Sequence, residues 1–305
     1  MINYNRLKGI IFGLTASAVW GSFYPVSRLI FGNELEKYDE LYISALRVAL
    51  SFIVMTPFLW IGNSRKVLKS NWKKDIPWFI LLALSCLGEA VLVFISTKYT
   101  TAARASLMAN TAPIFTAIIA FFMVREALNR SKIAGMILGF LGITLAVLSN
   151  GSDTFTGGCS TLYGDLLALG SGVCWAFFTV AGEKVANRYG GMFSTAVTAG
   201  IGTIFIFLIV FLSGAQIRFD FSWKAWLGLL YLGGGVNGLN IGLWYMALKY
   251  LRPGELGGFG YITALLAIAL SVIFVNERFS WSFILAIPLV LCGIYLMLRK
   301  SSKDV

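Results

Sequence analysis

Ten apolar stretches, joined by short polar connections, constrain this chain more than any other feature of its sequence. A helix that crosses the hydrocarbon core of a bilayer needs about 20 mostly apolar residues. Only 13% of the 305 residues are charged, against roughly a quarter in a soluble domain. We therefore predict an all-α integral membrane protein with ten transmembrane helices. The stretches lie near residues 10–31, 41–61, 76–97, 103–124, 132–149, 164–186, 193–213, 225–248, 254–275 and 281–298.

The basic residues predict the direction of these spans. With the N-terminus placed in the cytoplasm, 17 of the 25 Lys and Arg residues fall in cytoplasmic segments, 7 fall outside and Arg47 lies within a span. Such a bias is typical of cytoplasmic loops. We expect a multi-pass protein of a bacterial-type inner membrane with both termini cytoplasmic. The net charge of +11 is then a topology signal, and no nucleic-acid partner is expected.

The residues that most enzymes need are missing or scattered. The chain has no histidine, and its four cysteines have no paired spacing. A His-ligated zinc protease and a Ser-His pair are therefore excluded, and no GxSxG elbow is present. We expect neither an enzyme nor a bound metal or cofactor.

An internal repeat divides the chain into two halves. Lys98-Tyr99 and Lys249-Tyr250 both end a span, 151 residues apart, and the same offset pairs Gly142-Ile143 with Gly293-Ile294. We predict a first five-helix repeat at 1–150 and a second at 155–305. Because five spans is an odd number, the second repeat would enter the membrane inverted. Inverted repeats are common in transporters, where the two repeats alternately expose a midplane site.

Six motifs follow one another along the chain: WGSFYPVSR in the first span, ALRVALSF around Arg47, NTAPIFTAIIAFFMVREAL, WYMALKYL, ITALLAIALSVIFVNERFSW and the closing GIYLML. In their order and spacing they resemble those of the EamA family within the drug/metabolite transporter superfamily. The resemblance covers essentially the whole chain as two units. It implies a ten-helix carrier of amino acids, other metabolites or drugs, often an exporter. The family's usual proline appears as Pro113, but the matching position in the ninth span is Ala264, so a proline kink is not expected there.

Glu89 is the one carboxylate near the middle of a predicted span. An ionisable group at that depth is costly and usually faces a cavity or another helix. One interpretation is a proton or cation coupling site, or a counter-charge for a cationic substrate, because burial raises the pKa of a carboxylate. The alternative is a structural partner for Arg47, and the sequence leaves both open.

Polar and aromatic residues near midspan form a candidate substrate site. Asn237, Asn240 and Trp244 share one face of the eighth span, where the amides would hydrogen-bond a substrate or join neighbouring helices. A cavity with aromatic walls would suit an aromatic or amphipathic solute, or an organic cation, whereas packing between helices is the alternative. Its predicted walls are Trp20, Tyr24, Trp175, Trp244 and Tyr261.

Residues nearer the span ends have simpler interpretations. Asn110 and Tyr261 are matched by the repeat and would line the two ends of the pathway. Charged residues at span ends are interpreted as caps, anchors or ion pairs between helices. These are Arg104, Glu126, Glu277 and Arg278.

Together these features predict a secondary active transporter of a small metabolite, working by alternating access. The expected substrate is an amino acid, an amine or a related amphipathic or aromatic solute, with proton coupling or an export or exchange mode. Alternatives are a passive channel or facilitator, and a non-transporting membrane protein. The expected partners are the solute, the lipid bilayer and protons; a monomer would suffice, and a dimer is compatible.

Overall fold

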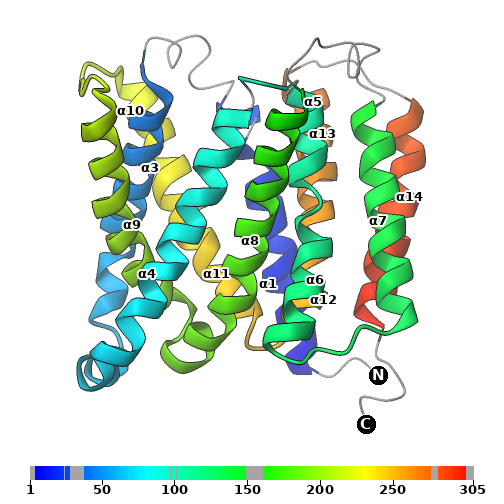
Figure 1. Cartoon of the computed structure of the whole chain (residues 1–305), viewed down its shortest axis with the longest axis horizontal. Coiled ribbons are helices and arrows are strands. Elements are labelled where there is room, and N and C mark those ends of the chain that lie inside the picture. The colour runs from blue at the N-terminus through cyan, green and yellow to red at the C-terminus, as the bar shows by residue number, and fades with distance from the viewer. Residues whose placement is uncertain are drawn as a thin grey trace. The chain divides into compact units, whose positions relative to one another are not determined.

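The computed structural model describes residues 4–23, 25–27, 38–96, 98–100, 102–148, 161–275 and 281–299. Every regular element in these residues is a helix (Figure 1). In chain order the elements are α1 (Tyr4–Gly21), α3 (Glu40–Met55), η2 (Thr56–Leu59), α4 (Ser64–Ser96), α5 (Ala102–Ala109), α6 (Ala112–Met123), α7 (Arg130–Leu148), α8 (Thr161–Tyr189), α9 (Gly191–Ser213), α10 (Trp223–Leu230), η4 (Tyr231–Leu239), α11 (Asn240–Ala247), α12 (Pro253–Gly257), α13 (Phe259–Val275) and α14 (Trp281–Leu298).

Within the described residues, eight helical stretches are long and apolar enough to cross a membrane. They are Tyr4–Ser27, Leu41–Leu59, Ser64–Val93, Arg104–Met123, Arg130–Val147, Leu162–Tyr189, Gly191–Ser213 and Pro253–Phe274. A shorter apolar helix covers Phe283–Leu298, and α10, η4 and α11 follow one another without a gap. These stretches overlap the ten segments expected from the sequence, with bounds that differ by up to about a dozen residues, and a membrane crossing by each of the ten stays a prediction.

The fourth expected span is broken in its middle. Helix α5 ends at Ala109 and α6 begins at Ala112, just before Pro113. Proline lacks an N–H group and disfavours helical backbone in the residue before it, so a break at this place is expected. The Thr111 hydroxyl donates to the Met108 carbonyl at 2.6 Å and satisfies one acceptor at the break. By contrast, Ala264 lies inside the uninterrupted α13, as its lack of proline predicts.

The eighth expected span changes its helical geometry. Its central part, η4, is a π-helix, and the N–H of Asn240 donates to the carbonyl of Gly235, five residues earlier. π-Helical turns are rare and are frequently found at functional sites. The sequence gives a reason for the change, because four glycines lie in this stretch and glycine is a poor former of regular α-helix. They are Gly233, Gly234, Gly235 and Gly238.

The described chain forms two compact units. Unit 1 comprises Met1–Leu87 with Gly182–Tyr250, and unit 2 comprises Gly88–Ala181 with Leu251–Val305. Each unit therefore draws on both of the sequence repeats proposed above. Helices α4 and α8 each belong to unit 1 over part of their length and to unit 2 over the rest.

Unit 2 has its tightest packing where α7 and α14 run side by side, in green and red in Figure 1. A β-carbon on Gly135 would lie 2.4 Å from the carbonyl oxygen of Gly293, and one on Gly142 would lie 2.7 Å from Val290. Small residues let helices approach closely in lipid. The surrounding core is apolar and includes Ile143, Ala286 and Val290 among its fully buried residues.

Unit 1 uses the same device between α3 and the π-helical stretch. A β-carbon on Gly233 would lie 2.6 Å from the carbonyl oxygen of Arg47, and one on Gly234 would lie 2.6 Å from Val54. The glycines of η4 therefore bring its backbone against α3, and this contact sets the position of the polar residues described next.

Candidate functional site

In unit 1, Arg47 lies inside α3 with its guanidinium directed to the π-helical stretch. Its Nη2 donates to the amide oxygen of Asn237 at 3.1 Å, and its guanidinium carbon lies 4.6 Å from the centre of the Phe23 ring. A cation over an aromatic face is attracted by the ring's quadrupole. Asn237 is therefore engaged with Arg47, which is one of the two roles that the sequence left open for the amide.

Asn240 lies one turn further along, at the junction between η4 and α11. Its side chain is 1% exposed, and its Nδ2 donates to the carbonyl oxygen of Ala16 in α1 at 3.0 Å. Its Oδ1 is buried and has no hydrogen-bond partner among the described residues. A buried acceptor without a donor is costly, so this amide is a strong candidate for contact with a solute's N–H or O–H group.

Trp20 and Trp244, two of the predicted walls of the site, contact each other in unit 1. Their ring centres are 5.1 Å apart, with the planes at 65° in an edge-to-face arrangement. Trp244 is buried and Trp20 is half-buried. Tyr24, the other aromatic wall predicted in the first span, lies outside the described residues.

In unit 2, Glu89 lies where α4 packs against α8. It is half-buried, and a β-carbon on the preceding Gly88 would lie 3.1 Å from Sγ of Cys174. Glu89 interacts electrostatically with Cys174. Glu89 belongs to unit 2 and Arg47 to unit 1, so the choice between a coupling role and a structural pair with Arg47 stays open.

Asn110 occupies the break between α5 and α6. Its Nδ2 donates to the carbonyl oxygen of Ser106 at 2.8 Å, and the neighbouring Ala109 carbonyl lies 3.0 Å from where a β-carbon on Gly172 would stand. Broken helices in transporters expose backbone groups to substrates and ions. Asn110 lies at such a break, and its place at one end of a substrate pathway stays a prediction.

The two remaining aromatic residues differ in their surroundings. Trp175 is half-buried, and its ring centre lies 5.4 Å from that of Phe178. Tyr261 is fully buried against α7, where a β-carbon on Gly139 would lie 2.4 Å from its ring. Its hydroxyl donates to the Met136 carbonyl at 3.4 Å. These contacts favour packing for Tyr261, and its place on a substrate pathway stays a prediction.

The comparison with protein families gives the decisive observation. The family model described as the EamA-like transporter family matches residues 7–148 and again 162–299. The chain belongs to the EamA-like transporter family. It is a multi-span membrane protein, and a transporter role is supported.

Individual relatives agree with this assignment. An uncharacterized transporter of Archaeoglobus fulgidus is 28% identical over 257 residues, which cover 83% of this chain and 86% of that protein. The uncharacterized transporter YetK of Bacillus subtilis is 24% identical and covers 95% of this chain and 86% of its own length. A solved crystal structure has a TM-score of 0.79 with 21% identity, covering 96% of this chain and 98% of that one. That likeness shows a shared fold.

This EamA-family chain has ion pairs near the ends of its helices, as the sequence predicted for two of four residues. Lys132 donates to Glu126 at 2.7 Å, and the other oxygen of Glu126 accepts from the N–H of Gly254 at 2.8 Å. Arg104 forms an ion pair with Asp165. The other two residues, Glu277 and Arg278, lie outside the described residues.

Sequence reasoning missed two carboxylates in this EamA-family chain. Asp165 accepts from both Arg104 and Thr100, and Asp75 accepts from Arg188 at 3.3 Å and from the buried Tyr189. Each carboxylate follows a connecting segment and begins an apolar run, which was the available signal. Both tie α8 to another helix, Asp165 within unit 2 and Asp75 within unit 1.

Proposed function

We propose that this protein is a secondary active transporter of a small metabolite and works by alternating access. The observation that carries the proposal is the match of the family model to both parts of the chain. We further propose ten crossings, arranged as inverted five-helix repeats at 1–150 and 155–305. The two family matches support this division, and five crossings in each repeat would reverse the second.

The proposed substrate is an amino acid, an amine or a related amphipathic or aromatic solute. The edge-to-face pair of Trp20 and Trp244 supports an aromatic or cationic group, and the buried Oδ1 of Asn240 supports a hydrogen-bond donor on the solute. The residues proposed to contact substrate in unit 1 are Trp20, Tyr24, Asn237, Asn240 and Trp244; in unit 2 they are Glu89, Asn110, Trp175 and Tyr261.

The location and coupling are part of the same proposal. The excess of Lys and Arg in alternate connections supports cytoplasmic termini in a bacterial-type inner membrane. Glu89 is the proposed proton carrier, because the chain has no histidine and Glu89 is the one carboxylate near the middle of a predicted span.

A thermal-shift screen of the detergent-purified protein against amino acids, amines and nucleosides tests the substrate class. A solute that binds the native state but not the unfolded state raises the unfolding temperature, and the rise continues with the logarithm of the solute concentration above the dissociation constant. Trp20→Ala should remove the shift, while the matched Trp223→Ala, which changes a largely exposed tryptophan of α10, should keep it. A shift that survives in Trp20→Ala would contradict the aromatic site, and a loss of folded protein would favour packing instead.

Transport measured under an imposed pH gradient tests the coupling. Glu89→Gln should abolish pH-driven transport, whereas Glu89→Asp keeps a carboxylate and should retain part of it. Unchanged transport by Glu89→Gln would remove Glu89 as the coupling residue. Retained transport by an Asn237→Ala and Asn240→Ala double variant would likewise count against the proposed amide contacts.

A further inference from the structure

The connection from η2 into the start of α4 carries an unusual concentration of positive charge. We call Trp60–Lys74 the basic turn. It has no carboxylate, and its five basic side chains are all exposed. They are Arg65, Lys66, Lys69, Lys73 and Lys74.

The acidic residue that directly follows the basic turn in the sequence does not neutralise this charge. Asp75 is only 4% exposed and is turned inward to Arg188 and Tyr189. On the adjoining part of α8, Lys184 lies over the ring of Trp78 at 4.5 Å and adds a further cation. The outer surface of the basic turn is therefore strongly positive.

Large aromatic side chains lie exposed among these cations. Trp60 is 60% exposed and Trp72 is 55% exposed. The Arg65 guanidinium lies 5.3 Å from the ring centre of Trp60, and the Lys73 ammonium lies 5.9 Å from that of Trp72. Tryptophan is enriched at membrane–water interfaces, where one end of the ring system is apolar and the other is wet.

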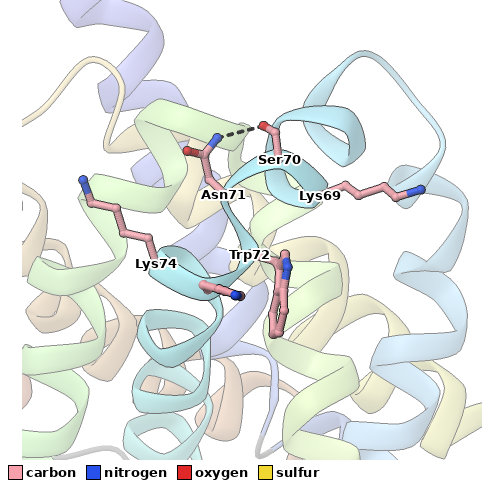
Figure 2. A pocket seen from close by; sticks show the side chains of 6 residues that line it. Lys69, Ser70, Asn71, Trp72 and Lys74 are labelled. Atoms are coloured by element: carbon pink, nitrogen blue, oxygen red, sulfur yellow. Dashed lines mark hydrogen bonds between the residues drawn. The ribbon is translucent and has the colours of Figure 1, made fainter.

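A kink at Asn71 interrupts the first part of α4. The backbone there leaves the helical region (φ −122°, ψ 17°), and the Asn71 amide donates to the carbonyl of Val67 at 3.0 Å. Residues 69–74 line an open surface depression of about 370 Å³. Figure 2 shows Lys69 and Lys74 extending to opposite sides of the turn, with Asn71 bonded to Ser70.

The position of the basic turn restricts what its partner is. It connects two candidate membrane spans, Leu41–Leu59 and Ser64–Val93, and overlaps the first turns of the second. Such a short connection stays at the membrane surface, within reach of lipid headgroups. Clusters of four to eight Lys and Arg residues beside a membrane helix are typical of binding to anionic lipids.

We propose that the basic turn binds the headgroups of anionic phospholipids, with Trp60 and Trp72 in the interfacial layer. The lysines at the kink contact the phosphate oxygens, and the tryptophans hold the turn at headgroup depth. The bound lipid stabilises the first part of α4 and thereby unit 1. This inference needs a membrane protein but does not depend on which solute is transported.

Native mass spectrometry and thermal unfolding of the purified full chain in mixed micelles test the proposal. Phosphatidylglycerol should be retained and should raise the unfolding temperature, whereas phosphatidylcholine should do neither. Each cation near an anionic surface contributes about fivefold to binding, so Lys69→Gln/Lys73→Gln/Lys74→Gln should lose at least about tenfold in phosphatidylglycerol affinity. Trp72→Ala keeps every charge and should weaken binding by a smaller factor.

A matched triple variant removes the same charge from exposed positions elsewhere, as Arg130→Gln/Lys224→Gln/Lys249→Gln. This control should bind phosphatidylglycerol like the unaltered protein. Equal losses in both triple variants would overturn the proposal, because binding would then follow net charge alone. Unchanged affinity in both the lysine triple variant and Trp72→Ala would also overturn it. Displacement of the lipid by millimolar inorganic phosphate would indicate a site for free phosphate instead.

Discussion

Two helix pairs, one in each unit, are both held together by close packing at glycines, but they differ in the side chains at the contact. In unit 2, α7 and α14 meet through Gly135, Gly142 and Gly293 in regular α-helical geometry and an apolar core. In unit 1, α3 meets the π-helical stretch through Gly233 and Gly234, and this contact includes a charged side chain.

The difference between the pairs suggests how their roles are divided. The α7–α14 pair has apolar side chains and backbone in contact, which suits a scaffold that keeps one arrangement. The α3–η4 pair holds the hydrogen bond from Arg47 to Asn237 within a stretch whose backbone bonds are already displaced from the α-helical pattern. We infer that function depends on the second pair and stability on the first.

The largest expected effect is on the apolar pair. Gly135→Ala would place a methyl group 2.4 Å from the Gly293 carbonyl oxygen. Because this oxygen belongs to the backbone of α14, it can move away only if the helix itself shifts. We expect a loss of about 1–3 kcal/mol in the free energy of unfolding, measured by denaturant titration in detergent. Gly260→Ala, whose nearest neighbour would be 3.6 Å away, is the control and should fold normally. Equal stability in the two variants would refute the tight packing.

A second substitution allows the two helix pairs to be compared directly. Gly233→Ala would also press on backbone, 2.6 Å from the Arg47 carbonyl oxygen, but in a helix that is already irregular. We expect a smaller loss of stability than for Gly135→Ala and a larger loss of transport per folded molecule. Gly235→Ala, in the same stretch with 3.6 Å of clearance, is the control. If transport falls only with the amount of folded protein in each case, the division of roles is wrong.

The polar bond in unit 1 should give a measurable but modest coupling. A double-mutant cycle of Arg47→Gln and Asn237→Ala should give an interaction energy of about 1 kcal/mol, in the range of hydrogen bonds between membrane helices. The cycle removes the contributions that each side chain makes to other groups. A coupling near zero would mean that the contact is incidental.

The smallest effect is expected outside both pairs, in the connection between α9 and α10. The Arg218 guanidinium, 2.5 Å from Asp220, holds the pKa of that carboxyl below its usual value by hydrogen bonding. A lowered pKa in the folded state adds stability above the ordinary aspartate pKa, and this is lost as the pH falls through the lowered value. Asp220→Asn should therefore unfold at a slightly lower temperature at pH 7, with the difference vanishing in acid. A difference that persisted in acid would have another cause.

Much of the fold followed from the sequence because hydrophobic length is a simple signal in membranes. The apolar segments were predicted from length and composition. The break before Pro113 was not predicted, although the missing N–H of proline explains it. The π-helical stretch was not predicted either, because its glycines are equally compatible with close packing of a regular helix.

The candidate site could be predicted only in part, since residue type gives polarity but not direction. Trp20 and Trp244 pack edge to face, which is compatible both with a substrate cavity and with packing between helices, so their roles stay a prediction. Arg104 and Glu126 form ion pairs as expected. The partner of Asn237 was missed, because nothing in a single sequence states which face of α3 Arg47 occupies. Asp75 and Asp165 were overlooked because each lies at the edge of an apolar run, where a carboxylate normally faces water.

Solute counterflow into liposomes that contain the purified protein tests the central claim of carrier-mediated transport most directly. The liposomes are loaded with the solute that stabilises the protein, and uptake of the same labelled solute is followed over a range of external concentrations. We predict saturable uptake that is stimulated by the internal solute and transiently exceeds equilibrium. Uptake that rises in proportion to the external concentration and does not depend on the internal solute would contradict the account and indicate a channel.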